Sequence, residues 1–333
     1  MKRILMLATG GTIASMDRGN GLEPAITSGE ILRYVPEAAG ICEIEAIQLL
    51  NLDSTNITPS HWLMISGAIE KHYRDFDGFV VTHGTDTMAY TAAALSYLIQ
   101  KSPRPIVITG SQKSIAMHDT DARRNLIDSF RYASDPDSHE VSLVFNGRVI
   151  LGSRARKERS KSYNAFVSVD YPEIAVIRDN RLIRYLTPTP YAYGAEPVFY
   201  HRLESRIFLM TLIPGLDPGI LKKLMEVDYR AVICQSFGVG GLPGGSDGQL
   251  AEEMGKWIDS GRSILMMTQV PYEGSDMAVY QVGKQVKERY RVLEAYNMTL
   301  EAAVTKLMWV LGQTDDREEI KRLFYIPVQC DRI

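Results

Sequence analysis

The sequence has little cysteine and no marked excess of either charge. Only three of its 333 residues are cysteines, Cys42, Cys234 and Cys330. An odd, widely spaced set of this kind excludes a disulfide framework and indicates reduced thiols in a cytoplasm. The 37 lysines and arginines nearly balance the 40 aspartates and glutamates, which leaves a net charge of −3. This balance argues against a protein that depends on overall charge attraction to nucleic acid.

Long apolar runs and metal-ligand motifs are also missing. No apolar stretch approaches the ~20 residues that span a bilayer, so we expect no membrane partner. The first run, Ile4–Ala8, meets two glycines at once and predicts a buried strand instead of a signal peptide. Neither Cys-x-x-Cys nor His-x-x-x-His occurs, and the Gly-rich turn fits neither a dinucleotide fingerprint nor a P-loop. We therefore expect no metal site, and the motifs favour neither a bound dinucleotide nor a P-loop nucleotide.

What the sequence does contain is a regular alternation of strand-like and helix-like segments. The expected strands are Ile4–Ala8, Glu45–Leu50, Phe79–Thr82, Ile106–Thr109, Val141–Phe145, Ile207–Leu212, Ala231–Gln235 and Ile264–Thr268. The expected helices are Ser28–Tyr34, Pro59–His72, Thr87–Gln100, Asp121–Ala133, Gly219–Met225, Gln249–Ser260 and Thr299–Leu311. This order predicts an α/β fold with parallel sheets covered on both faces.

A proline-rich stretch from Thr187 to Pro197 divides the alternation into two parts. We expect a larger N-terminal domain with a doubly wound parallel sheet at residues 1–186. A linker would follow at 187–202, and a smaller C-terminal α/β domain at 203–333.

Small polar residues and glycines follow four of the expected strands, and ligands of parallel sheets bind at these carboxyl ends. The segments are Thr9–Ser15, Asn51–Asn56, His83–Thr87 and Thr109–Gln112. Each alone is explained by a turn or a helix cap, and His83 alone predicts a structural hydrogen bond. Together the four predict a polar pocket for a small ligand.

A basic segment surrounds Lys157, with Arg154, Arg156, Arg159 and Lys161 nearby. It could be a solvated face or a subunit interface. A nucleic-acid surface is disfavoured because only Tyr163 is available there to stack on bases. A lysine in this segment could also serve catalysis if it is partly desolvated.

Several of these segments together resemble the bacterial-type L-asparaginases, and their cytoplasmic type I branch in particular. The resemblance rests on Thr9–Ser15 and on His83–Tyr90, which are similar to the two signature motifs of that family. It extends to Leu52–Thr55 followed by Thr58-Pro59-x-x-Trp62, to Ile108–Gln112, and to Phe237–Gly241 and Met298–Trp309. It covers nearly the whole chain.

The resemblance implies hydrolysis of L-asparagine to L-aspartate and ammonia, with no cofactor. It implies that Thr12 is the nucleophile and that Lys157, held by Asp86, tunes Thr85 as the activating group. Substrate binding would fall to Gly11, Asp53, Ser54, Thr55, Gly84, Thr85 and Asp86. Ser54 and Asp86 would hold the substrate's α-carboxylate and α-ammonium, and N–H groups of the glycine-rich turns would form the oxyanion hole. By the same resemblance we expect a homodimer or a homotetramer.

The sequence departs from the family pattern at two positions. Leu22 stands where many members carry a tyrosine, so it cannot donate a hydroxyl to Thr12. Thr55 stands where others carry glutamine, which would change discrimination against glutamine. The glycine-rich stretch 238–243 does not identify the residue that some members lend to a neighbouring subunit.

Two other functions stay open, and so does regulation. One alternative is the ammonia-generating, asparaginase-like subunit of a tRNA-dependent amidotransferase, whose additional N-terminal domain would not fit before a motif that begins at residue 9. The other is a catalytically silent amino-acid-binding module, which the presence of both Thr12 and Lys157 disfavours. By resemblance, the loop Gln269–Gly274 would lie near a second, allosteric asparagine site.

Overall fold

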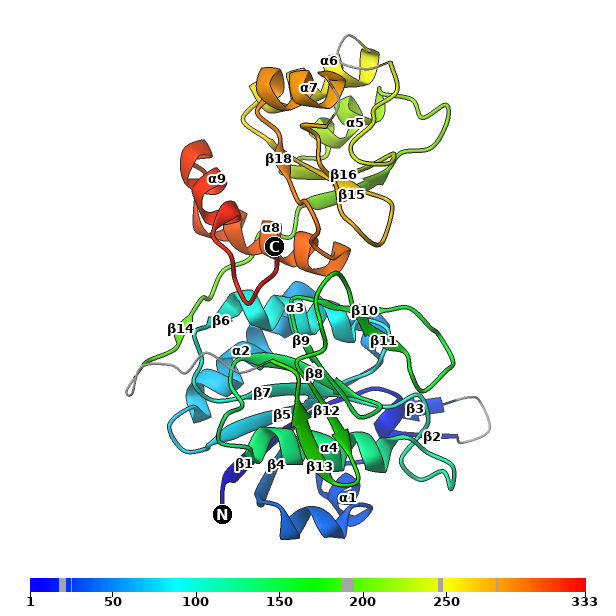
Figure 1. Cartoon of the computed structure of the whole chain (residues 1–333), viewed down its shortest axis with the longest axis vertical. Coiled ribbons are helices and arrows are strands. Elements are labelled where there is room, and N and C mark those ends of the chain that lie inside the picture. Colours follow the sequence, from blue (N-terminus) through cyan, green and yellow to red (C-terminus); the bar gives the residue numbers. More distant parts are fainter. Residues whose placement is uncertain (18–21, 25, 187–194, 245–247, 280) are drawn as a thin grey trace. The chain divides into compact units, whose positions relative to one another are not determined.

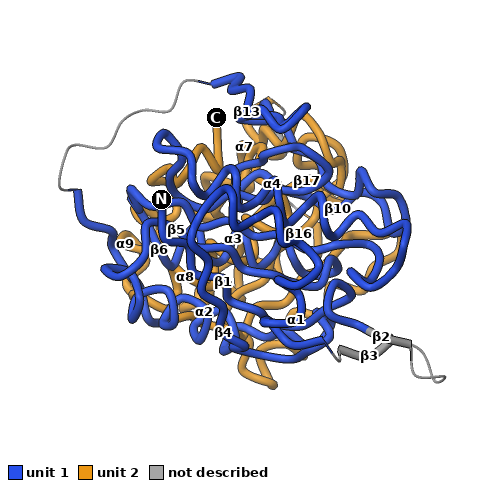
Figure 2. The backbone as a smooth tube through the Cα atoms, turned by 90° about the horizontal axis from the view of Figure 1, so that it is seen from below, with its two compact units in different colours: residues 1–202 blue, residues 203–333 orange. Residues whose placement is uncertain are grey.

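The computed structural model describes residues 1–17, 22–24, 26–186, 195–244, 248–279 and 281–333 (Figure 1). The chain forms two compact units, Met1–Arg202 and Leu203–Ile333, shown in two colours in Figure 2. In the part of the chain that is described, no helix combines the length and the apolar character needed to cross a membrane.

The first unit is built on an eight-stranded sheet with the order β13-β12-β9-β8-β7-β5-β1-β4. Five neighbouring strands are parallel: β4 (Glu43–Leu52), β1 (Arg3–Gly10), β5 (Gly78–Thr82), β7 (Ile106–Thr109) and β8 (Val141–Phe145). Three antiparallel strands extend the sheet: β9 (Arg148–Leu151), β12 (Ala175–Arg178) and β13 (Arg181–Arg184). The parallel part matches the expected strands closely.

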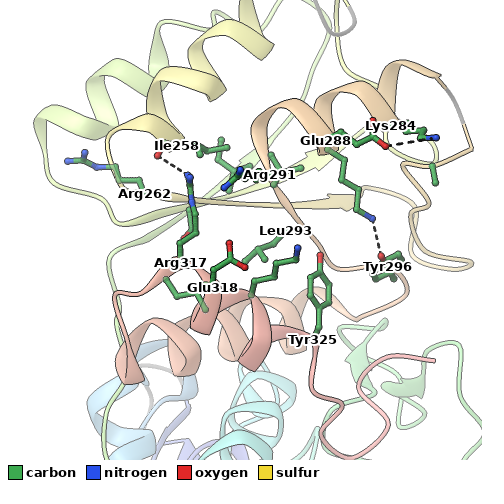
Figure 3. A pocket seen from close by; sticks show the side chains of 17 residues that line it. Ile258, Arg262, Lys284, Glu288, Arg291, Leu293, Tyr296, Arg317, Glu318 and Tyr325 are labelled. Carbon is green, nitrogen blue, oxygen red and sulfur yellow. Dashed lines mark hydrogen bonds and ion pairs between the residues drawn. The ribbon is translucent and has the colours of Figure 1, made fainter.

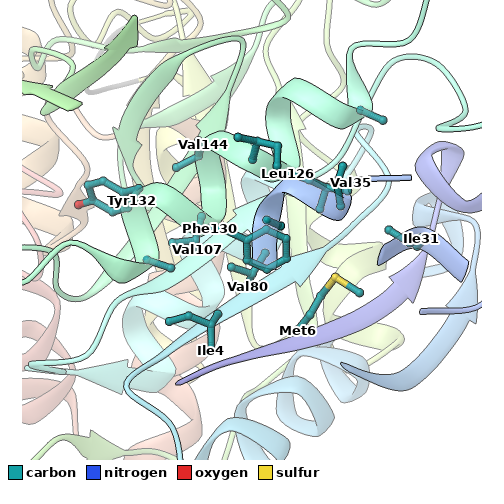
Figure 4. Packing of buried hydrophobic residues seen from close by; sticks show 14 of the residues in the cluster. Ile4, Met6, Ile31, Val35, Val80, Val107, Leu126, Phe130, Tyr132 and Val144 are labelled. Atoms are coloured by element: carbon teal, nitrogen blue, oxygen red, sulfur yellow. The ribbon is translucent and has the colours of Figure 1, made fainter. Parts of the chain in front are cut away.

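Helices cover both faces of this sheet, as expected. The helices are α1 (Ser28–Arg33), α2 (Pro59–His72), α3 (Met88–Leu98) and α4 (Ala122–Ser134). Alternate strand residues such as Met6 and Val80 pack with Phe130 of α4 in one buried cluster (Figure 4). Their neighbours in sequence point to the opposite face, where α3 packs against β7 and β8.

The antiparallel edge of the sheet was not predicted. Its strands have four residues each, and Arg148, Arg178 and Arg181 stand at their ends, so their apolar runs are short. The turns do carry a signal: Asn146 and Gly147 both have positive φ, 50° and 71°, as do Asp179 and Asn180. An Asn-Gly pair with this geometry is typical of a tight β-hairpin. Attention to turn chemistry would have extended the predicted sheet.

Smaller elements complete the first unit. They are the hairpins β2 (Ser15–Asp17) with β3 (Leu22–Pro24) and β10 (Ala155–Lys157) with β11 (Phe166–Ser168), and the pair β6 (Ile99–Gln100) with β14 (Val198–Phe199). The expected linker begins in residues 187–194, outside the described part. Its later portion contains β14, which pairs with β6 inside the first unit.

The second unit is a four-stranded parallel sheet in the order β15-β16-β17-β18. The strands are β15 (Ile207–Thr211), β16 (Ala231–Ser236), β17 (Ser263–Thr268) and β18 (Leu293–Glu294), and the helices are α5 (Ile220–Glu226), α6 (Gln249–Asp259), α7 (Gln281–Tyr290), α8 (Leu300–Gln313) and α9 (Arg317–Tyr325). Of these, α7, β18 and α9 were not expected. Helices α7 and α9 are rich in charged and polar residues, and β18 is only two residues long, so none shows a long apolar pattern.

Candidate active site

Glycines bring three loops at the carboxyl ends of the parallel strands into backbone contact. A Cβ atom added to Gly11 would lie 2.4 Å from both Cα and N of Gly84. A Cβ atom added to Gly84 would lie 2.7 Å from Oγ of Ser54. The turns after β1, β5 and β4 therefore meet at one point, and only hydrogen in place of a side chain permits this approach.

The turn after β1 sets the direction of the backbone N–H of Thr12. Gly11, at φ 80°, precedes the short 3₁₀ helix η1 (Thr12–Ala14). Its carbonyl accepts from Ala14 N at 3.1 Å and from Ser15 Oγ at 2.9 Å. Because a peptide is planar, the N–H of Thr12 points the opposite way. Within the described residues neither this N–H nor the Thr12 hydroxyl has a hydrogen-bond partner, so both are available to a ligand.

Ser54 fixes the start of the loop that carries Thr85 and Asp86. This serine is buried, at 3% exposed. Its Oγ accepts a hydrogen bond from Asp86 N at 3.3 Å, and its carbonyl accepts one from the Thr87 hydroxyl at 2.7 Å. The end of β4 thus holds the segment just before α3 through two bonds from different residues.

Lys157 connects the two candidate catalytic residues of this loop. Its Nζ donates to Thr85 Oγ1 at 2.8 Å and to Asp86 Oδ1 at 2.6 Å. The Lys157 side chain is 15% exposed, whereas that of Asp86 is 59% exposed. Strand β10, paired with β11 from Lys157↔Phe166 to Ala155↔Ser168, presents the lysine. One residue of the basic segment therefore lies in the polar site, 72 positions from its threonine partner.

Gln112 completes the surroundings of Thr85, although it was not predicted as a site residue. The Thr85 hydroxyl donates to Gln112 Oε1 at 3.1 Å. The amide nitrogen of the same side chain donates to Ser162 O at 3.1 Å, which sets its orientation. Since an ammonium only donates, the Thr85 oxygen accepts from Lys157 while its proton is directed to Gln112. The position of Gln112 just after β7 was the available signal.

His83 holds the peptide that leads into Thr85. It is fully buried, and burial lowers its pKa to about 4, so it is neutral at pH 7. The Gly84 carbonyl only accepts, so Nδ1 donates to it at 2.7 Å, and Nε2 accepts from the Thr91 hydroxyl at 2.9 Å. Thr91 in turn accepts from Trp62 Nε1 at 3.0 Å. With the Gly84 carbonyl fixed in this direction, the N–H of Thr85 faces the other way.

Asp53 and Thr55 interact with each other at the same edge. Asp53 Oδ1 accepts from the Thr55 hydroxyl at 2.6 Å and from Thr55 N at 2.8 Å. These bonds lower the pKa of Asp53, the side-chain bond more than the backbone bond. Thr55 is exposed, and its hydroxyl is already engaged, so any contact with a ligand would require it to exchange this partner. Leu22 belongs to β3, but its side chain lies outside the described part.

The close glycine contact gives a stability prediction. We expect Gly11→Ala to destabilise the fold by about 2–4 kcal/mol, since the new methyl meets the Gly84 backbone at a positive φ. Gly67→Ala is the matched control: it lies in α2 with nothing within 4 Å of the added Cβ, and we expect about 0.5–1 kcal/mol of stabilisation. Urea unfolding of both variants measures the difference. Equal stability of the two variants would contradict the contact.

Comparisons with known proteins show the family of both units. Residues 3–190 match the family profile "Asparaginase, N-terminal", and residues 206–324 match "Glutaminase/Asparaginase C-terminal domain". The two-unit α/β fold, in which each unit matches one of these profiles, defines the class. The chain belongs to the asparaginase/glutaminase family.

Individual relatives fall into two groups. An L-asparaginase of Thermococcus kodakarensis is 37% identical over 96% of this chain and 96% of the relative. A solved structure of a thermostable L-asparaginase from the same organism, 35% identical, superposes with a TM-score of 0.90 and covers 99% of this chain and 98% of that one. A subunit of the glutamyl-tRNA(Gln) amidotransferase of Metallosphaera sedula is 34% identical over 96% of this chain and 74% of the relative.

Proposed function

We propose that this protein is an L-asparaginase that hydrolyses L-asparagine to L-aspartate and ammonia through Thr12. One observation carries the proposal: a single lysine, Lys157, bridges Thr85 and Asp86 beside the glycine contact that positions Thr12. Full-length similarity to an L-asparaginase supports the same substrate.

In the proposed reaction, the Thr12 oxygen bonds to the side-chain amide carbon of asparagine. The carbon–nitrogen bond then breaks, and ammonia leaves with the proton that Thr12 gives up, which produces an ester. Water adds to this ester, releases aspartate and returns a proton to Thr12. In the described part of the chain the N–H groups of Thr12 and Thr85 donate to no acceptor. They are suited to donate to the oxyanion, each donor being worth about 2.7–4 kcal/mol in comparable enzymes.

Lys157 and Asp86 act on Thr85 in this scheme. Lys157 Nζ lies 2.8 Å from the Thr85 oxygen. In its uncharged form this amine accepts the Thr85 hydroxyl proton, and the cation so formed stabilises negative charge on the Thr85 oxygen. Thr85 then takes a proton from the attacking nucleophile or water. Asp86 holds the lysine through Oδ1, and its Oδ2 is suited to accept from the substrate's α-ammonium. The Ser54 hydroxyl accepts from Asp86 N and can donate to the α-carboxylate.

Quaternary structure, location and regulation follow the family resemblance. We propose a homodimer or homotetramer in the cytoplasm, and a second asparagine site near Gln269–Gly274. The cysteines support the location, because none of the three, all of which are described, forms a disulfide bond. Cys42 and Cys234 are buried, and Cys330 is exposed.

The decisive measurement is ammonia release by the purified chain from L-asparagine, L-glutamine and D-asparagine across a wide concentration range. We expect turnover of L-asparagine to exceed that of the other two, with a sigmoidal dependence on concentration. Hyperbolic kinetics would contradict the second site while leaving the activity intact.

A role within an amidotransferase is the second candidate, because relatives of that name are similar over 96% of this chain. It predicts ammonia release that depends on a partner protein and on aminoacylated tRNA. A silent binding module predicts aspartate binding in a calorimeter with no turnover. Either result would replace the proposed activity.

A further inference from the structure

The second unit contains a cavity of about 640 Å³ with a strongly cationic lining (Figure 3). It lies between the α7 segment and α9, with β17 and β18 contributing the floor. Six of its lining side chains are cationic and two are carboxylates, although the whole chain carries a net charge of −3. The cations are Arg262, Lys284, Lys287, Arg291, Arg317 and Lys321.

Half of these cations are compensated by nearby carboxylates. Lys287 pairs with the buried Glu294, and Arg262 lies 3.7 Å from Asp228. Lys284 lies 3.9 Å from Glu288, one of the two carboxylates of the lining. These groups therefore contribute little unbalanced charge.

The other three cations have no carboxylate within ion-pair distance in the described part of the chain. Arg291 follows α7, whereas Arg317 and Lys321 lie four residues apart on α9 and so project from the same side of that helix. Arg317 donates to the Ile258 carbonyl at 3.0 Å, which orients its guanidinium but does not neutralise it. Glu318 is the remaining carboxylate of the lining. The residue after α7 and two residues of α9 thus supply three cations to the cavity, with one carboxylate beside them.

Apolar and aromatic groups set the cavity's size but not its selectivity. Leu293, Ile264 and Ile320 form apolar parts of the wall. The rings of Tyr296 and Tyr325 lie 6.2 Å apart, and each already has the Arg332 guanidinium near its face, at 5.2 and 5.1 Å. Lys287 lies 4.8 Å from the Tyr296 ring. Because cations already occupy these ring faces, a ligand would be recognised by its charge.

We propose that this cavity is a second binding site, separate from the Thr12 site, for a small organic or inorganic polyanion with at least two anionic groups. Guanidinium groups bind phosphates and carboxylates through paired N–H donors. The volume lies within the range of about 300–1,000 Å³ that is usual for small-molecule sites. A ligand that spans Arg291 and Arg317 would tie α9 to the end of α7. Binding would therefore stabilise the second unit against heat.

The test is isothermal titration calorimetry on the full chain with pyrophosphate and, separately, with citrate, at an ionic strength matched with potassium chloride. We expect a saturable 1:1 isotherm with a dissociation constant below about 1 mM for at least one probe, together with a rise in melting temperature. Binding of pyrophosphate alone assigns the site to phosphates, and binding of both assigns it to polyanions in general.

The variant Arg291→Gln/Lys321→Gln should bind the same probe at least about tenfold more weakly, since two charged contacts are lost. Lys222→Gln/Lys223→Gln removes the same charge from α5, which lines no part of the cavity, and should bind like the wild type. Absence of saturable heat with both probes would overturn the proposal. Equal weakening in the two double variants would also overturn it, because it would show general charge attraction. The readout does not involve the proposed amide hydrolysis, so the two proposals can fail independently.

Discussion

Thr12→Ala is expected to lower kcat for L-asparagine by at least about 10⁴-fold, because losing a nucleophile removes the covalent route entirely. The fold should be unaffected. In the described part of the chain the Thr12 hydroxyl has no hydrogen-bond partner, so its removal leaves no buried group unsatisfied. The free energy of unfolding should change by less than about 0.5 kcal/mol. Ammonia release and urea unfolding, measured on one preparation, separate chemistry from stability.

Thr12→Ser is the matched control for this variant. It keeps the hydroxyl and loses only a methyl group, so its turnover should stay well above that of Thr12→Ala. Acid-quenched enzyme should also carry an aspartyl ester on the Thr12 peptide, absent from Thr12→Ala. If Thr12→Ala kept more than about a tenth of the wild-type rate, the activation free energy would have risen by less than about 1.4 kcal/mol. Thr12 would then not be the nucleophile.

The parallel strands could be predicted from their runs of apolar residues. The same criterion missed the shorter strands of the two sheets. Phe79–Thr82 and Val141–Phe145 are fully buried strands, whose sequences are almost entirely apolar because both faces are covered. Strand β13 alternates exposed and half-buried residues at the sheet edge, and arginines stand at both of its ends, so its apolar run is only two residues long. Helix α7 is anchored by the contact of Lys287 with the buried Glu294, an interaction between residues that no amphipathic pattern reveals.

The candidate site was predictable in its residue types but not in its contacts. Glycines and hydroxyls after several strands indicated a shared pocket, because parallel strands end at the same edge. The partnership of Lys157 with Thr85 joins residues 72 positions apart, and only the hairpin of β10 and β11 brings them together. Gln112 is a similar case: its role depends on the direction of one side chain, which Ser162 O fixes. Such orientations arise from packing and leave no spacing rule in the sequence.

The contact between Lys157 and Thr85 gives the second large prediction. Thr85→Val and Lys157→Met are each expected to lower kcat by about 10³-fold, because each removes one half of the same proton-accepting unit. The double variant should lose little more than either single variant, since residues that act as a unit are not additive. The Met substitution should cost little stability, because Asp86, which loses its partner, is 59% exposed and is solvated by water.

Lys161→Met is the control for charge. It removes a cation from the same basic segment at an exposed position, and we expect kcat to stay within about twofold of wild type, as for an exposed surface substitution. The measurement is a double-mutant cycle on kcat, with urea unfolding of every variant. Losses that multiply to about 10⁶-fold would show that Thr85 and Lys157 act independently. In that case the lysine would serve the reaction through Asp86 and the substrate's ammonium, and the 2.8 Å bond to Thr85 would be a positioning contact only.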